Sequence, residues 1–137
     1  MKIEMKKPKK TKLQKSKADP NSRYWRNKAD KLWSELVRAR DGDKCAICGA
    51  EKNVQAHHLV DRVIKILRHR LENGISLCPG CHKFNRRLSA HRGVVPFVVR
   101  LQLQEPLKFD WVMDHWLDED VGWDYKAAYE SLNAQAT

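Results

Sequence analysis

Two Cys-x-x-Cys pairs constrain this chain more than any other feature. Cys45 and Cys48 form the first pair, Cys78 and Cys81 form the second, and 29 residues separate the pairs. Each pair presents two thiolates from one tight turn, and two such turns match a tetrahedral four-cysteine zinc site. A zinc ion held by four thiolates has no open coordination position. We therefore expect a structural zinc that stabilises the fold, and any catalysis must use other residues.

The length and composition favour one domain. A chain of 137 residues is long enough for one compact domain but short for two. Its apolar residues never approach the run of about 18 that a membrane-spanning helix needs. The N-terminus is rich in lysine with no apolar segment behind it, unlike a secretory signal. We therefore expect an intracellular, cytoplasmic protein without membrane contact, in which reduced cysteines act as metal ligands rather than disulfides.

The net charge of +10 is distributed unevenly along the chain. Residues 1–23 carry eight lysines and Arg23 against two acidic side chains, a balance of +7. Residues 105–137 have eight acidic side chains against two lysines, a balance of −6, so residues 24–104 hold the remaining +9. A basic arm beside a basic middle suggests a nucleic-acid partner, whereas a merely solubilising charge explains the same pattern about as well.

The first 20 residues contain few apolar side chains and many lysines, and Pro8 and Pro20 interrupt them. This composition predicts an arm, residues 1–20, that is disordered when free. Such an arm could follow the phosphates of DNA through contacts that weaken in salt and ignore base sequence. A plain solvated tail is the alternative. Residues 21–137 are expected to form a single domain.

A long helix is predicted before the first cysteine pair. A cap at Asn21 or Ser22 begins it, and it runs to about Ala39, where Asp41-Gly42-Asp43 stops it. Its apolar side chains recur at three- and four-residue steps and form one core stripe. They are Trp25, Ala29, Leu32, Trp33, Leu36 and Val37. The other faces carry basic side chains that could also contact DNA.

Between the two cysteine pairs the sequence predicts two short strands. Residues 53–60 form the first strand and residues 75–77 the second, with Asn73-Gly74 as a tight turn before it. Residues 61–71 could form a helical turn or a buried loop. A basic helix is expected from about His82. This order of strand, strand and helix around one metal site predicts an α+β fold.

Further helices are predicted after the second cysteine pair. Pro96 suits the first turn of a helix over residues 94–104, although the second half of that segment alternates like a strand. We favour the helix. Residues 109–117 and 124–133 have helical patterns as well. These segments are expected to form a helical extension, residues 94–135, that closes the core, with docking of a partner as the alternative.

The histidines near the cysteine pairs fall in a recognisable register. His57 and His58 are adjacent, Asn73 precedes the second cysteine pair by five residues, and His82 follows Asn73 by nine. Over about residues 45–90 this arrangement resembles the HNH endonuclease family in its zinc-stapled form, and the flanks resemble small phage members of that family. The resemblance implies a ββα-metal core, DNA as substrate and a bacterial or phage-infected cell.

The resemblance also implies a role for each residue of this register. His58 corresponds to the general base, and Asn73 to the residue that braces the loop between the strands and so orients that base. His57 and His82 correspond to the ligands of a catalytic divalent ion, which is Mg²⁺, Mn²⁺ or another divalent transition metal. No small-molecule cofactor is expected.

A third protein ligand for that ion stays open. Some relatives have one where this chain has Arg86, which leaves Asn85 and His91 as weak candidates. For His91 and His115 a structural role is favoured. For His69 a surface position is favoured, with a phosphate contact as the alternative.

Strand geometry supports a division of roles between His57 and His58. Neighbouring residues on a strand point to opposite faces, so the two rings should not bind one ion side by side. A neutral imidazole near pH 7 can take a proton from water, and a divalent ion can stabilise the charge on the phosphate. Basic side chains near these residues are the expected nucleic-acid contacts. They are Arg68, Arg70, Lys83, Arg86 and Arg87.

These features predict a metal-dependent endonuclease that hydrolyses DNA phosphodiester bonds, with 5′-phosphate and 3′-hydroxyl ends as the resemblance implies. The alternative is a catalytically inactive, zinc-stabilised DNA-binding or adaptor module, which needs the cysteines and the basic surface but not the histidine register. An RNA-directed nuclease ranks lower, because the sequence offers no aromatic stacking platform. The target, the number of strands cut and the oligomeric state stay open.

Overall fold

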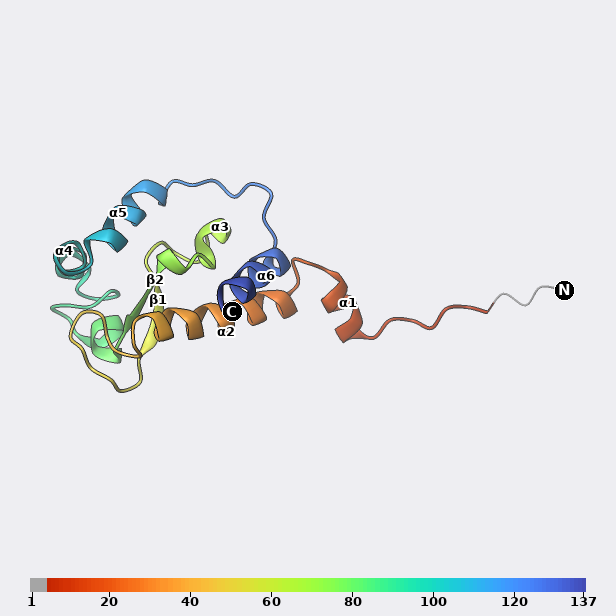
Figure 1. Ribbon diagram of the computed structural model, residues 1–137, viewed down its shortest axis with the longest axis horizontal. Coiled ribbons are helices and arrows are strands. Elements are labelled where there is room, and N and C mark those ends of the chain that lie inside the picture. The colour runs from red at the N-terminus through yellow and green to blue at the C-terminus, as the bar shows by residue number, and fades with distance from the viewer. Residues whose placement is uncertain (1–4) are drawn as a thin grey trace.

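The computed structural model describes residues 5–137 of the chain. It is an α+β structure, mostly helical, with one antiparallel sheet of two strands (Figure 1). The elements in chain order are α1 (Lys12–Ala18), α2 (Arg23–Arg40), β1 (Gln55–His58), α3 (Lys65–Arg68), the 3₁₀ turn η1 (Leu71–Asn73), β2 (Gly74–Leu77), the π-helical turn η2 (Gly80–Phe84), α4 (Val94–Gln104), α5 (Pro106–His115) and α6 (Tyr125–Gln135). Among the described residues, no helix combines the length and apolar character needed to cross a bilayer.

Helix α2 is the longest element, and both the sheet and α6 pack along it (Figure 1). The helix predicted to begin with a cap at Asn21 or Ser22 and to run to about Ala39 is therefore confirmed, with Ser22 at the cap position. Its predicted stripe explains the packing, because Ala29, Trp33 and Val37 are buried together with Leu132 of α6. Burial of one apolar stripe supplies most of the stability of a helix in a folded protein.

The two strands pair so that His57 lies opposite Ile75 and His58 lies opposite Gly74. Side chains alternate across a strand, so His57 shares a face with Ile75, and His58 lies on the other face, toward α2. Ile75 belongs to the core cluster around the cysteines, whereas Ala56 packs against the cluster of α2 and α6. The sheet thus separates the two adjacent histidines.

The connection between the strands differs from the predicted one. Asn73 ends a 3₁₀ turn, and Gly74 already has an extended backbone with a φ of −110°, so the predicted tight turn at this pair is wrong. A Cβ atom on Gly74 would come within 3.0 Å of side-chain atoms of Trp33 and Val37. Glycine is needed here because it lets α2 approach β2. The ambiguous segment 61–71 contains the single helical turn α3.

The second core cluster surrounds the cysteines. Ile47, Ile75 and Leu77 pack there with Phe97 and Leu101 of α4. The helix favoured over residues 94–104 is therefore confirmed, and it covers the cysteine side of the sheet. The basic helix predicted from about His82 is wrong in length, because η2 is one turn.

Helix α5 forms where it was predicted, but its apolar stripe does not close the core. Phe109 is half-buried, whereas Met113, Trp116 and Leu117 are exposed. Phe97 and Leu101 of α4 already fill the core on that side, and α5 packs against α4 and η1. The expectation that this stripe is core is corrected accordingly.

Within the predicted basic arm the structure has a helix, α1, over Lys12–Ala18, none of whose residues is buried. Thr11 and Gln14 form a capping box: the Thr11 hydroxyl accepts from the Gln14 amide at 3.1 Å, and the Gln14 side chain accepts from the Thr11 amide at 2.8 Å. Trp25 Nε1 donates to the Lys17 carbonyl at 3.0 Å and links the arm to α2. Residues 1–4 of the arm lie outside the described residues.

Asp41 links the end of α2 to β2. Its Oδ2 accepts from the Ser76 amide at 2.9 Å, and its Oδ1 accepts from Arg40 Nε at 2.9 Å. Burial alone would raise the pKa of Asp41, but the bonds from Arg40 and from the Ser76 amide outweigh it and hold that pKa below the ordinary carboxyl value. The ionised carboxylate therefore stabilises the fold at neutral pH.

We predict that Asp41→Asn lowers the free energy of unfolding at pH 7 by about 1 kcal/mol. Because the folded-state pKa is depressed, this difference is present above the ordinary carboxyl pKa and shrinks as the pH falls below about 4. Urea unfolding at several pH values measures it. Asp43→Asn at a neighbouring exposed position is the matched control. An equal loss at pH 3 and pH 7 would contradict the assigned role of the charge.

Candidate metal centres and catalytic site

The four cysteines come together at one point. Their sulfur atoms all lie within 4.8 Å of one another, and the Sγ atoms of Cys48 and Cys78 are 3.6 Å apart. Thiolates about 2.3 Å from a tetrahedral zinc ion lie about 3.8 Å from one another, so the cluster has the size of such a site. Gly49, with a φ of 79°, supplies the left-handed residue of the first turn. The cluster could therefore hold a structural metal such as zinc.

Backbone hydrogen bonds join this cluster to the sheet. The Ala46 amide donates to the Ser76 carbonyl at 2.9 Å, which attaches the first cysteine turn to β2. Burial alone would raise the pKa of Cys45, but nearby backbone amides, including those of Cys78 and Cys48, lower that pKa to about 7. A thiol of this kind readily gives the thiolate that a metal requires.

We predict that the wild-type chain binds one zinc ion at the cysteines. Cys78→Ser should abolish this binding and lower the midpoint of thermal unfolding, because metal binding contributes folding free energy. Zinc measured per chain, together with a thermal melt of the same sample, tests this. Val63→Ser, a substitution at an exposed position, is the control. A wild-type chain that keeps its full melting temperature without zinc would refute the structural role of the cluster.

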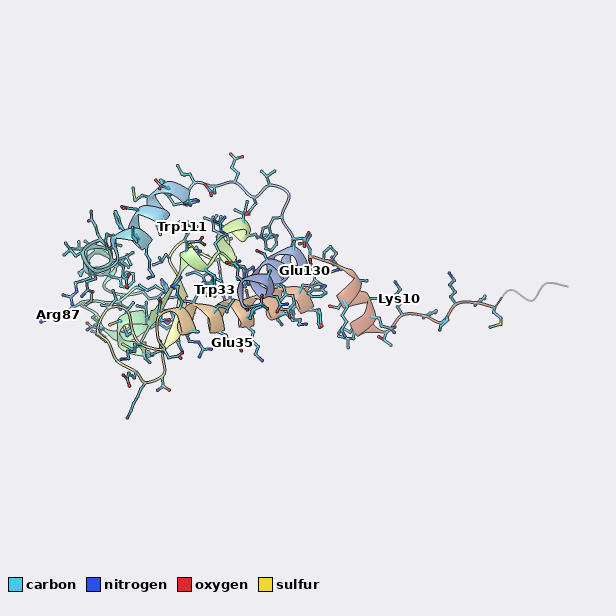
Figure 2. The ribbon with its side chains drawn as sticks, viewed as in Figure 1. Lys10, Trp33, Glu35, Arg87, Trp111 and Glu130 are labelled. Atoms are coloured by element: carbon cyan, nitrogen blue, oxygen red, sulfur yellow. The ribbon has the colours of Figure 1, made fainter. Side chains whose placement is uncertain are left out.

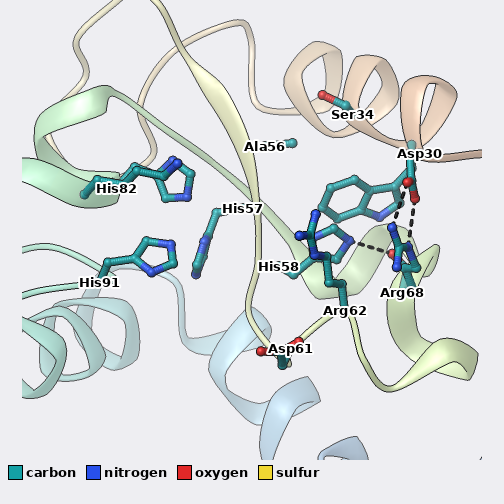
Figure 3. A pocket seen from close by; sticks show the side chains of 12 residues that line it. Asp30, Ser34, Ala56, His57, His58, Asp61, Arg62, Arg68, His82 and His91 are labelled. Carbon is teal, nitrogen blue, oxygen red and sulfur yellow. Dashed lines mark hydrogen bonds and ion pairs between the residues drawn. The ribbon is translucent and has the colours of Figure 1, made fainter. Parts of the chain in front are cut away.

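A second cluster forms from three histidines on the cysteine side of β1. The ligand nitrogens of His57, His82 and His91 lie within 4.8 Å of one another. Ring centroids are 4.9 Å apart for His57 and His82, and 5.3 Å for His57 and His91. Figure 3 shows the three rings turned toward one another from β1, from η2 and from the loop before α4. Three converging imidazoles are a donor set for a divalent transition metal.

The hydrogen bonds and pKa values of this cluster suit metal binding. His82 Nδ1 donates to the Gln55 side-chain oxygen at 2.8 Å, which leaves Nε2 with a lone pair. Burial, followed by the nearby charges of His82 and His91, lowers the pKa of His57 to about 3. Burial also lowers the pKa of His82 to about 4. Both rings are therefore neutral at pH 7, the form that binds a metal.

His91 is the residue that sequence reasoning undervalued. Its amide donates to the His82 carbonyl at 3.1 Å, so the loop before α4 folds back and brings the imidazole to the cluster. The other candidate for a third ligand, Asn85, uses its side-chain oxygen to accept from the amides of Arg87 and Leu88. The sequence did contain one sign of this role, because His91 follows closely after the turn that holds Cys81 and His82.

His58 lies on the opposite side of β1, as strand alternation predicted. Its ring stacks on Trp33 with centroids 3.9 Å apart and 8° between the planes. Nε2 lies 2.9 Å from the Arg68 carbonyl and must donate to it, so Nδ1 keeps its lone pair. Burial lowers the pKa of His58 to about 4, so the ring is neutral at pH 7.

One open cavity of about 500 Å³ connects the two sides. His57, His58, His82 and His91 all line it (Figure 3). The cavity is also lined by residues that sequence reasoning did not single out as site residues, among them Asp61 and Arg62. The cavity therefore places a potential proton acceptor near a potential metal site.

Asn73 is fully buried. Its side-chain oxygen accepts from the Val60 amide at 2.7 Å, and its side-chain nitrogen donates to the carbonyls of Val60 and Leu67 at 3.0 and 3.1 Å. The Asn73 carbonyl accepts from the Leu59 amide at 2.9 Å. One side chain thus joins both ends of the loop that connects the strands.

The basic residues divide into two groups. Arg70, Lys83, Arg86 and Arg87 are exposed. Arg68, also expected to contact nucleic acid, forms a two-point ion pair with Asp30. The surface position favoured for His69 is wrong, because its ring is buried and bound to the same carboxylate.

The chain matches no protein-family model, no curated protein and no solved structure. A proposal about its function therefore depends on the geometry of the site and on the residues that form it.

Proposed function

We propose that this chain is a metal-dependent endonuclease of the HNH type, which hydrolyses phosphodiester bonds of DNA. The carrying observation is the arrangement around β1, where three histidines converge on one side, and His58, with an unprotonated Nδ1, lies on the other side. A ββα-metal core would then consist of β1, β2 and η2, with zinc at the four cysteines as its structural staple. The short η2 is the least regular part of that core.

In this proposal His58 is the general base. Its neutral ring can accept the proton of an attacking water through Nδ1, while Nε2 stays bonded to the Arg68 carbonyl. Asn73 holds the ends of the connecting loop, and this loop includes the carbonyl that orients His58. The stacked indole of Trp33 keeps the imidazole plane fixed.

His57, His82 and His91 would hold the catalytic divalent ion. When bound, that ion supplies Lewis-acid stabilisation of the phosphate charge and of the leaving oxygen. Nitrogen ligands favour transition metals such as Mn²⁺ or Zn²⁺ over Mg²⁺, which prefers oxygen. Among the metals considered, the donor set therefore favours a transition metal.

Basic side chains provide a surface for the DNA backbone. Arg62 and Lys83 line the cavity, and Arg86 and Arg87 are exposed just beyond η2. Arg87 lies toward one end of the molecule, and Lys10, in the basic arm, lies toward the opposite end (Figure 2). Contacts of this kind are electrostatic, so DNA affinity should fall steeply with salt.

The rival proposal is an inactive, zinc-stabilised DNA-binding or adaptor module. It accounts for the cysteine cluster and the basic surface. It gives no reason for three histidines to converge beside a fourth whose tautomer is fixed. Binding of DNA without cleavage across several divalent metals would favour it.

We predict that His58→Ala lowers the rate of plasmid nicking about 10²- to 10⁴-fold, the range typical of a lost general base. The rate is measured on supercoiled plasmid with Mn²⁺ in excess. His115→Ala is the matched control, because His115 bonds to the Trp111 carbonyl away from the cavity. Cleavage by His58→Ala at the wild-type rate would remove His58 as the base.

We also predict that His91→Ala raises the Mn²⁺ concentration needed for half-maximal nicking by more than about tenfold. Loss of a residue that only supports a metal ligand already lowers metal affinity by about that factor, and loss of a ligand should cost more. Asn85→Ala, which changes the other candidate for a third ligand, should leave the metal requirement unchanged. Titration of Mn²⁺ against nicking rate distinguishes the two. An unchanged requirement in His91→Ala would exclude it as a ligand.

A further inference from the structure

Helix α2 directs two side chains, Asp30 and Trp33, toward the loop that joins the strands. Asp30 Oδ1 accepts from Arg68 Nε at 2.9 Å, and Oδ2 accepts from Arg68 Nη2 at 2.8 Å (Figure 3). Oδ1 also bonds to His69 Nε2 at 2.7 Å. Trp33 Nε1 donates to the Arg70 carbonyl at 2.9 Å. Three consecutive residues of the loop, Arg68, His69 and Arg70, are therefore fixed to one face of α2.

The same three residues include the hydrogen-bond acceptor of His58. The Arg68 side chain is held by Asp30, and the Arg68 carbonyl accepts from His58 Nε2 at 2.9 Å. Trp33 meanwhile covers the face of the His58 ring. Helix α2 thus controls the plane of the imidazole through Trp33, and the position of its hydrogen-bond acceptor through Asp30.

We propose that Asp30 is a positioning residue, which holds the Arg68 carbonyl in place and thereby keeps His58 in the tautomer with the proton on Nε2. The inference rests on the proposed function for the catalytic role of His58. The clamp formed by Asp30, Arg68 and His69 is itself a feature of the fold, so it can be tested without DNA cleavage.

The chemistry of the clamp favours orientation over simple packing. The side chains of Asp30 and Arg68 are 32% and 12% exposed, and partly burying such a pair has a desolvation cost that an apolar contact avoids. His69 is 6% exposed, and its Nδ1 has no hydrogen-bond partner among residues 5–137. A two-point bond between a guanidinium and a carboxylate, however, fixes direction as well as distance. This property suits a contact that must orient a neighbouring carbonyl.

The competing interpretation is that Arg68 leaves Asp30 to bind a substrate phosphate. Asp30 would then restrain an arginine that contacts DNA, and neutralising Asp30 would release it. That interpretation predicts tighter DNA binding in Asp30→Asn and an unchanged tautomer of His58. The two interpretations therefore differ in both observables.

The experiment compares zinc-loaded wild type, Asp30→Asn and Glu35→Gln, whose substituted residue is exposed on the same helix. Long-range ¹H–¹⁵N correlation spectra report which imidazole nitrogen carries the proton, and His58→Ala identifies the His58 signals. We expect the Nε2–H tautomer in wild type and Glu35→Gln, and a mixture of tautomers in Asp30→Asn. In plasmid nicking, kcat of Asp30→Asn should fall about 10- to 100-fold, as for other orienting groups, with KM little changed.

Each outcome decides the inference. A wild-type tautomer with unchanged kcat in folded Asp30→Asn would overturn it, and so would tighter DNA binding with an unchanged tautomer. If Asp30→Asn does not fold, Arg68→Gln breaks the same ion pair and keeps the backbone carbonyl, and the same spectra apply. A changed tautomer in a protein that cuts no DNA supports the clamp and contradicts the endonuclease.

Discussion

The convergence of four cysteine side chains is the constraint on which the rest of the structure depends. One cysteine pair lies before β1 and the other follows β2, so in this antiparallel sheet both pairs lie at the same end, and their cluster closes that end. Each strand has only four residues. His82, the residue after Cys81, belongs to the histidine cluster. The His91 amide donates to the His82 carbonyl. A metal at the cysteines would therefore stabilise a small core and also fix where two of the three imidazoles lie.

The sheet then separates the histidines of the proposed site into two groups, one on each side of β1. Alternation along β1 directs His57 to the cluster of imidazoles and His58 to α2, where Trp33 and the Arg68 carbonyl determine its orientation. This separation requires α2 to lie close against β2, which Gly74 permits because it has no side chain. In the proposed reaction, one face of a short strand would carry the ion and the other face the base.

The sequence predicted what local pattern determines, namely the stripe of α2, the cysteine turns and the opposite faces of the adjacent histidines. It could not predict contacts made by long-range packing. Arg68 looked like a free cation, but it pairs with a carboxylate 38 residues earlier in the chain. His91 reaches the cluster along a loop that has no periodicity. The stripe of α5 was predicted to be core because a helical pattern identifies residues on one face but not whether another element covers that face.

The most direct test of the account is the metal dependence of DNA cleavage by the wild-type chain. The protein is loaded with zinc and then dialysed against a mild chelator, which removes loosely held ions while the four thiolates retain theirs. The account predicts that this protein leaves supercoiled plasmid intact and that added Mn²⁺ restores nicking, with the zinc content still at one ion per chain. Binding of the plasmid without nicking at any concentration of Mn²⁺, Mg²⁺, Co²⁺ or Ni²⁺ would contradict it.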